Sequence, residues 1–111
     1  MTKPNDLVQG TLDLLLLKLL ALQPMNGWSI SQRLKQVSSE VLQVSDGSLY
    51  PALYKLQEKG LIESEWGVTE TNRRAKFYSL TRLGRAQLQK ETKTWERLST
   101  AISYVVGLER A

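Results

Sequence analysis

The stretch that decides the fold is SDGSLYPALYKLQEKGLIES, residues 45–64. Its apolar residues recur at three- and four-residue steps, which is the pattern of one buried helix face. The pair Lys59-Gly60 that follows is a typical helix stop. The sequence therefore predicts a helix over residues 46–59 whose buried face is formed by Leu49, Ala52, Leu53 and Leu56.

The opposite face of this helix carries an unusual set of residues. Pro51 lies near the start, and Ser48, Tyr50 and Tyr54 occupy positions that should meet water. If the helix begins near Ser48, this residue is the N-cap or lies beside it. The proline nitrogen then falls in the first turn, where no backbone hydrogen bond is lost. The tyrosines either contact something outside the chain or simply pack on neighbouring elements.

Two further helices are expected before this one. Residues 1–8 read as a loose arm, and residues 9–22 as a helix with leucines on nearly every side, which usually means burial on all sides. So small a chain can hardly achieve that alone, which hints at a partner chain. A break at residues 23–27 precedes a helix over residues 27–37. Three helices with short links match a helix-turn-helix.

After Gly60 the pattern changes to that of a hairpin. Residues 61–67 (LIESEWG) and 74–80 (RAKFYSL) read as strands, joined by a polar loop that ends in consecutive arginines. The hairpin therefore has a charged tip. Trp66 is expected to lie opposite Phe77 or Tyr78 and to pack within the hairpin.

A last helix is expected from Thr81 to about Leu108. Leu88, Trp95 and Ile102 are spaced seven apart, and Leu98 and Val105 fall at the alternate seam position, a short coiled-coil pattern. Glu91 occupies one seam position and weakens the pattern.

The order helix–helix–helix–strand–strand–helix predicts a mainly α (α+β) chain with a winged helix-turn-helix. We expect a DNA-binding domain over residues 1–80, with the wing at residues 61–80, and a C-terminal dimerisation helix over residues 81–111. The DNA major groove, about 12 Å wide, admits one helix, and helix-turn-helix proteins direct its N-terminal residues at the bases. Cations on the wing would lie along the phosphate backbone or minor groove.

The charge of the chain is compatible with DNA as a partner. The chain has a net charge of +4 and a pI of about 9.5. Residues 73–93 carry seven basic residues against one acidic residue, or +6. A solvated helix face would explain this run equally well. Beside a helix-turn-helix, the basic wing residues favour a DNA clamp.

Composition excludes several other functions. With no Cys or His, the chain has no disulfide, thiolate zinc site or imidazole chemistry, and no tight Asp/Glu cluster suggests a metal. No side chain is placed to activate another, so we expect no enzyme activity and no cofactor. The apolar run at residues 12–22 is about half the length of a membrane span. We therefore expect a soluble, cytoplasmic protein.

Four motifs, GSLYPAL, KGLIESEWG, RRAKFYSLT and LGRAQL, resemble the PadR family of bacterial transcriptional regulators. The likeness extends over about residues 9–88. It implies a homodimeric winged-helix repressor on a pseudo-palindromic operator. A single C-terminal helix is similar to the short PadR subfamily, in which a planar hydrophobic small molecule can act as inducer.

The resemblance also implies roles for particular residues. DNA contact falls to the third helix and wing, with a phosphate neighbour at the start of the second helix: Ser48, Tyr50, Pro51, Tyr54, Lys55, Arg73, Arg74, Lys76, Trp28 and Ser29. Family members often carry tyrosine where this chain has Trp28. First and last helices interlock in the dimer, which assigns the interface to Leu12, Leu15, Leu16, Leu19, Leu88, Trp95, Leu98, Ile102 and Val105.

Two alternatives remain open from the sequence. Trp95 either stacks a ligand, as the resemblance implies, or only anchors the dimer. The winged helix either reads DNA or is a protein-interaction module without sequence-specific DNA binding. The operator, the regulated genes and the direction of regulation are not encoded in the chain.

Overall fold

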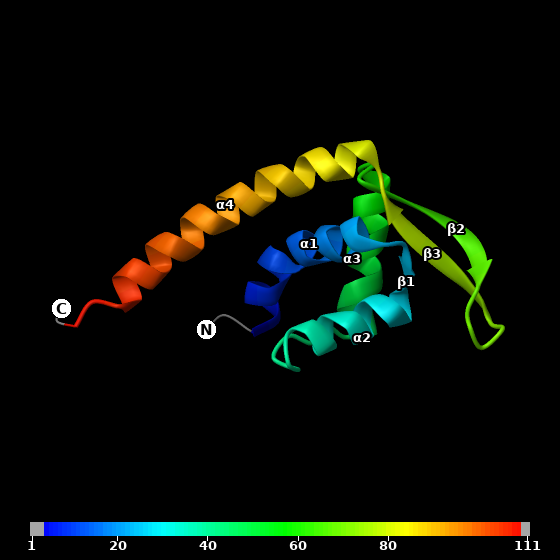
Figure 1. The fold of residues 1–111 in the computed structure, drawn as a ribbon, viewed down its shortest axis with the longest axis horizontal. Coiled ribbons are helices and arrows are strands. Elements are labelled where there is room, and N and C mark those ends of the chain that lie inside the picture. Colours follow the sequence, from blue (N-terminus) through cyan, green and yellow to red (C-terminus); the bar gives the residue numbers. More distant parts are fainter. Residues whose placement is uncertain (1–3, 110–111) are drawn as a thin grey trace.

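The computed structural model describes the backbone of residues 4–109 and the side chains of residues 11–109. The elements are α1 (Pro4–Leu22), β1 (Met25–Asn26), α2 (Gly27–Val37), α3 (Asp46–Glu58), β2 (Ile62–Val68), β3 (Arg74–Leu80) and α4 (Arg82–Val106) (Figure 1). The mixed α and β class is confirmed. The bounds of α2 and β3 agree with the sequence analysis.

The expected element order needs one correction, the additional strand β1. It pairs antiparallel with β3, with Met25 opposite Tyr78 and Asn26 opposite Phe77, and gives a three-stranded sheet in the order β1-β3-β2. The sequence analysis treated this segment as a simple break. Asn26 also caps α2, since its Oδ1 accepts a hydrogen bond from the Ser29 amide at 2.8 Å.

Helix α1 lies at the centre of the molecule and contacts α2, α3, β3 and α4. This explains its many leucines: Leu12, Leu16, Leu17, Leu19 and Leu20 are all buried by the chain itself. The assignment of Leu12, Leu16 and Leu19 to a dimer interface is therefore wrong, because they have almost no surface left for a partner. The backbone of α1 is helical from Pro4, which corrects the arm expected over residues 1–8. Residues 1–3 lie outside the described residues.

Helix α3 begins at Asp46, as the sequence predicts, and not near Ser48, the start that would place Pro51 in the first turn. Its N-cap is Ser45 and not Ser48, and the first helical backbone bond runs from the Leu49 amide to the Ser45 carbonyl at 2.8 Å. Pro51 therefore lies inside the helix, where its missing N–H leaves the Gly47 carbonyl without its ladder bond. The expectation that Pro51 loses no bond is wrong.

The predicted stop at Lys59-Gly60 is confirmed. Gly60 has a φ of +77°, a left-handed conformation that favours glycine. Its amide donates to the Gln57 carbonyl, and the Leu61 amide donates to the Leu56 carbonyl, the paired bonds of a Schellman motif. Residues 38–45, which connect α2 to α3, form a longer link than the three- or four-residue turn of a minimal helix-turn-helix.

Helix α4 is joined tightly to the body at its first turn. Thr81 caps it: its hydroxyl donates to the Gly60 carbonyl at 2.7 Å and accepts from the Gly84 amide at 3.0 Å. A Cβ on Gly84 would collide with the Leu61 carbonyl oxygen, so this close approach requires glycine.

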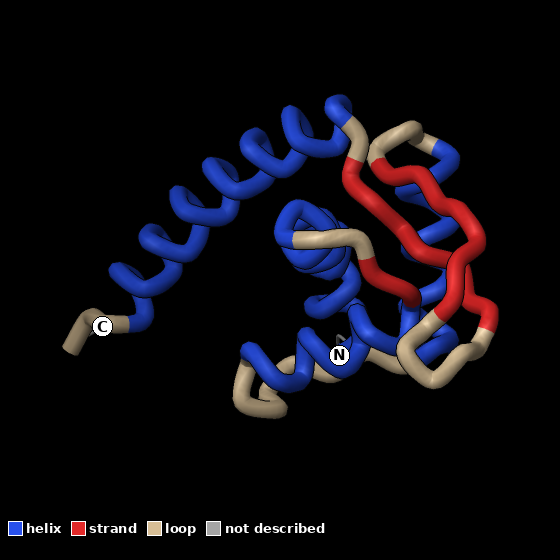
Figure 2. Tube along the Cα trace, turned by 45° about the vertical axis from the view of Figure 1, so that its right-hand side comes forward, coloured by secondary structure: helices blue, strands red, loops and turns tan. Residues whose placement is uncertain are grey.

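Beyond this joint, α4 extends away from the rest of the molecule (Figures 1 and 2). The chain measures 57 × 28 × 24 Å with a radius of gyration of 15.7 Å. A compact domain of about 100 residues has a radius near 13 Å. The excess reflects the projecting helix.

Candidate nucleic-acid interface

The face of α3 turned away from the core carries the residues predicted to read DNA. The four apolar residues of the opposite face are buried, as predicted. Pro51, Tyr54 and Lys55 are exposed, with Tyr54 at 55% of its surface, and Ser48 is half-buried. The helix therefore offers a phenol and an ammonium group to a partner in its first three turns.

Tyr50 lies differently from Tyr54. It is half-buried and packs against the core, and its ring lies so close to Gly27 that any Cβ there would collide with it. Burial raises the pKa of Tyr50, with Asp46 and Tyr54 adding to the effect. The two rings lie 6.3 Å apart at 40°. Packing on neighbouring elements thus explains the position of the Tyr50 side chain, whereas the Tyr54 side chain stays accessible to a partner.

The two strands of the wing, β2 and β3, pair in a regular antiparallel register. Trp66 lies opposite Lys76, and Val68 lies opposite Arg74. The expectation that Trp66 faces Phe77 or Tyr78 is wrong, because Ser64 faces Tyr78 and Glu65 faces Phe77. The Arg74 guanidinium carbon lies 4.5 Å from the Trp66 ring centroid, and the Lys76 Nζ lies 5.9 Å from it. Trp66 remains 59% exposed, so its partners are these cations.

The tip of the wing has a defined turn that presents Arg73. The Thr69 amide donates to the Arg73 carbonyl at 2.8 Å, and the Arg73 amide donates to Thr69 Oγ1 at 3.1 Å. Asn72 adopts a φ of +63°, which asparagine tolerates better than most residues. The Arg73 side chain is exposed.

The wing cations and α3 lie on the same side of the sheet. Side chains two residues apart on a strand share a face, so Trp66 shares a face with Ser64. The Ser64 hydroxyl donates to the Gln57 side chain of α3 at 3.1 Å. The Trp66 ring, and with it the stacked Arg74, therefore lies on the face of the sheet that is turned toward α3.

The start of α2 lies next to this surface. Trp28 is 70% exposed, whereas Ser29 is half-buried and its amide is already bonded to Asn26. Gly27 connects this end of α2 to Tyr50 of α3. The sequence analysis did not predict the roles of Gly27 and Asn26. Gly27 lets the Tyr50 ring approach the backbone closely, and the Asn26 side chain caps α2.

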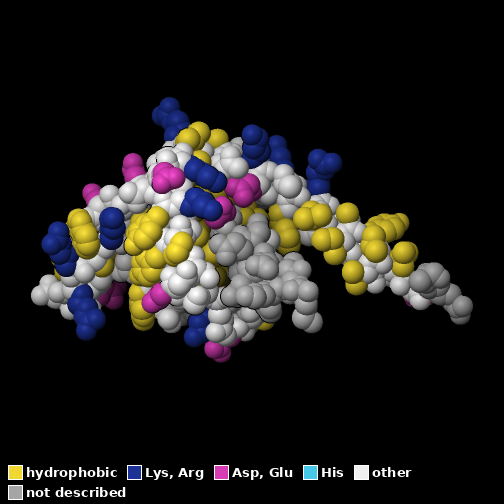
Figure 3. Space-filling view, turned by 180° about the vertical axis from the view of Figure 1, so that it is seen from behind, with side chains coloured by type: hydrophobic (Ala, Val, Ile, Leu, Met, Phe, Trp, Pro, Cys, Tyr) yellow, Lys and Arg dark blue, Asp and Glu magenta, His cyan; other side chains and the backbone are white. Residues whose placement is uncertain are grey.

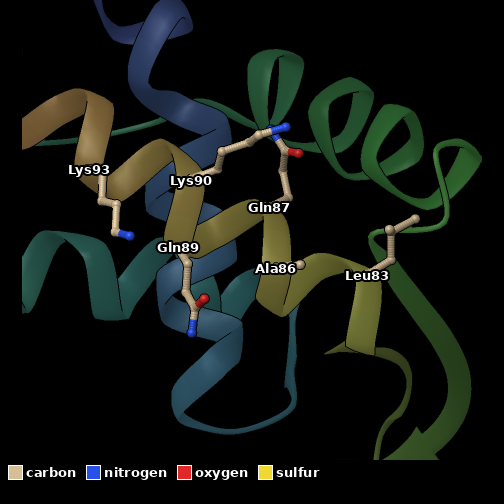
Figure 4. A pocket seen from close by; sticks show the side chains of 6 residues that line it. All are labelled: Leu83, Ala86, Gln87, Gln89, Lys90 and Lys93. Atoms are coloured by element: carbon tan, nitrogen blue, oxygen red, sulfur yellow. The ribbon is translucent and has the colours of Figure 1, made fainter.

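The outer half of α4 carries an uncovered apolar stripe (Figure 3). Leu98, Ile102 and Val105 are exposed and Trp95 is 43% exposed, whereas Leu88 is half-buried against the core. Shallow hollows along α4 are lined by α4 residues alone, one by Leu83, Ala86, Gln87, Gln89, Lys90 and Lys93 (Figure 4). Trp95 lines neither this hollow nor a second one at Thr94, Arg97 and Leu98.

Neither a metal site nor a membrane span is found in the part of the chain that the structure describes. No three Asp or Glu side chains there come together as metal ligands would. No helix among these residues is long and apolar enough to cross a bilayer.

A helix-turn-helix followed by a hairpin with a cationic face defines a winged-helix protein. Residues 16–90 match the model of the transcriptional regulator PadR-like family, and the chain belongs to this family. It is 34% identical over 68 residues to a transcriptional regulator of Mycobacterium tuberculosis, covering 61% of this chain and 63% of that protein.

Two solved structures have a similar fold. A PadR-like transcriptional regulator from Bacillus cereus gives a TM-score of 0.82 at 26% identity, covering 94% of this chain and 99% of that one. A transcriptional regulator from Clostridium thermocellum gives 0.81 at 27% identity, covering 89% and 96%. The PadR-like family consists of DNA-binding transcriptional regulators and not of enzymes.

Proposed function

We propose that this protein is a repressor that binds a pseudo-palindromic operator as a homodimer. In each protomer α3 enters the major groove and the wing follows the phosphate backbone. The observation that carries this proposal is that the wing cations Arg74 and Lys76 lie on the face of the sheet turned toward α3, whose residues Tyr54 and Lys55 are exposed. Two such units read half-sites about 34 Å apart.

The dimer half of the proposal is supported by α4. A projecting helix with exposed Trp95, Leu98, Ile102 and Val105 leaves an apolar stripe in water, which monomeric proteins avoid. A second copy of α4 and the half-buried Leu15 of α1 cover it. An interface of this kind buries on the order of 2,000 Å² or more.

We propose further that the repressor responds to a ligand that binds at Trp95. A planar hydrophobic molecule stacks on Trp95 at the dimer seam and favours a dimer whose two reading heads are mis-spaced for the operator. Trp95 as a plain dimer anchor is the alternative. Quenching of tryptophan fluorescence by planar dyes separates the two, with Trp95→Phe as the control, because Trp28 and Trp66 also fluoresce.

The proposal is tested by fluorescence anisotropy with a labelled duplex from the protein's own upstream region. A random duplex of equal length serves as competitor, at two salt concentrations. We expect tight, salt-sensitive binding that resists the competitor. Weak binding that any DNA abolishes would instead support a protein-interaction module, the second candidate for a winged helix.

The same assay examines the tip of the wing. Arg73→Ala should weaken binding to both duplexes and lower the slope of log affinity against log salt by about one, the effect of losing one phosphate contact. Lys35→Ala, which removes a basic residue of α2 outside the predicted contacts, is the control. An unchanged slope in Arg73→Ala would remove the tip from the DNA contacts.

A further inference from the structure

Trp66 is a large aromatic residue that the fold does not need for its core. It is more than half exposed on the free part of the wing, where an aromatic ring gains little from burial. Its cross-strand neighbour is Lys76, and the diagonal position holds Arg74. Both neighbours are cations, and both approach the ring.

The two cations are not equivalent. Arg74 lies 4.5 Å from the ring centroid, well inside the limit of about 6 Å for a cation–π interaction, whereas Lys76 lies at that limit, 5.9 Å away. A planar guanidinium also stacks on an aromatic face better than an ammonium group does. Arg74 is therefore the main partner of Trp66. A stacked guanidinium keeps the N–H donors at its edge available to an acceptor.

We infer that Trp66 is a positioning residue for DNA binding: it holds the Arg74 guanidinium ready for a phosphate oxygen of the DNA backbone. This inference rests on the proposed DNA-binding function. A long side chain on an exposed strand loses rotamer freedom when it binds. The Trp66 ring restricts those rotamers beforehand, so that less entropy is lost when the phosphate contact forms. Trp66 itself need not touch the DNA.

This role differs measurably from that of a charge. Replacing Trp66 leaves the number of cations unchanged, so the salt slope should stay the same while the affinity falls. Replacing Arg74 should lower both the salt slope and the affinity. The loss caused by Trp66 should also depend on Arg74, because a platform has no effect once the group it holds is gone.

The experiment measures anisotropy of the upstream and random duplexes with the full chain and five variants. These are Trp66→Ala, Trp66→Phe, Trp66→Leu, Arg74→Ala and the double variant Trp66→Ala/Arg74→Ala. The Phe and Leu variants are matched, because both keep an apolar side chain and only Phe keeps an aromatic face. Thermal unfolding of each variant shows that the fold is retained.

We expect Trp66→Ala to weaken binding to both duplexes about threefold to tenfold with an unchanged salt slope. Trp66→Phe should retain most of the affinity and Trp66→Leu should not. The double variant should bind like Arg74→Ala alone. Additive losses in the double variant would overturn the inference, since Trp66 would then act without Arg74. So would wild-type affinity in Trp66→Ala.

Failure of the proposed function has a separate signature. Wild-type protein that binds neither duplex would overturn DNA binding, and the role of Trp66 with it. Wild-type protein that binds the operator while all Trp66 variants bind equally well would overturn the positioning role alone.

Discussion

At the scale of single residues, the two tyrosines of α3 show how neighbouring positions divide their roles. Tyr50 and Tyr54 lie one helical turn apart and their rings approach each other, yet the first packs over Gly27 and the second faces water. The first tyrosine therefore bears on stability, whereas the second has a side chain that a partner can reach.

Substitutions on the exposed face of α3 should affect specificity. Lys55→Ala and Tyr54→Ala should each cost more on the operator than on random DNA, about 1–3 kcal/mol where the side chain meets a base edge. Competition anisotropy with both duplexes measures the difference. Equal losses on the two duplexes would make these residues contacts to the DNA backbone.

Tyr50→Ala should instead lower the unfolding midpoint, because it removes a ring packed against the core.

Buried tyrosines also predict how stability changes at alkaline pH. Burial raises the pKa of Tyr78, which is 2% exposed, and of Tyr50, with smaller contributions from neighbouring tyrosines. Because the folded-state pKa lies above the unfolded value of about 10, the stabilisation is complete below pH 10 and is lost as pH rises through the raised pKa.

Urea midpoints measured between pH 8 and 11 should therefore fall above pH 10. The fall should be smaller in Tyr78→Phe, which has no phenol to ionise at this buried position. All other side chains are the same in both proteins, so the comparison at equal pH isolates Tyr78. Parallel curves for the two proteins would contradict the prediction.

At the scale of elements, the joint between the wing and α4 depends on Gly84. Gly84→Ala should destabilise the protein by about 2 kcal/mol or more, because its Cβ collides with the Leu61 carbonyl, a backbone group that cannot rotate aside as a side chain can. The matched control is Gly47→Ala on α3, where a Cβ meets only the Ser45 hydroxyl at 3.8 Å. That control should gain about 0.5–1 kcal/mol from helix propensity. Urea unfolding of both variants decides whether the prediction holds.

The elements also show what the sequence could and could not predict. Periodicity predicted α2, the wing strands and the buried face of α3, because each extends over enough residues to repeat. It missed β1, whose two residues have no period and are defined by their partner strand. The register of the wing could not be predicted from periodicity either, because the position of Trp66 depends on how the turn at residues 69–73 aligns the two strands.

The leucines of α1 were misread for a related reason. A helix apolar on every side predicts burial but not by what, and here the covering surfaces are α2, α3, β3 and α4 of the same chain. The contact of DNA with the predicted residues and the pairing of α4 stay predictions, since a single chain tests neither.

At the scale of the whole molecule, the projecting α4 predicts that folding and association are coupled. Ile102→Glu should break the dimer and lower the melting temperature, because it places a charge on the exposed apolar stripe. Thr100→Glu, a change at another exposed position about half a turn away on the helix, should leave both unchanged. Light scattering and melting at several protein concentrations measure the effect. A wild-type monomer with a concentration-independent melting temperature would contradict it.

The joint at Thr81 has a consequence for chain length. Thr81 alone separates the last residue of β3 from the first of α4, and it bonds to both Gly60 and Gly84. One inserted residue there would turn the helix by about 100° relative to the wing. The link at residues 38–45 imposes no such angle on the elements it joins, so insertions and deletions among homologues should gather in that link and spare the joint.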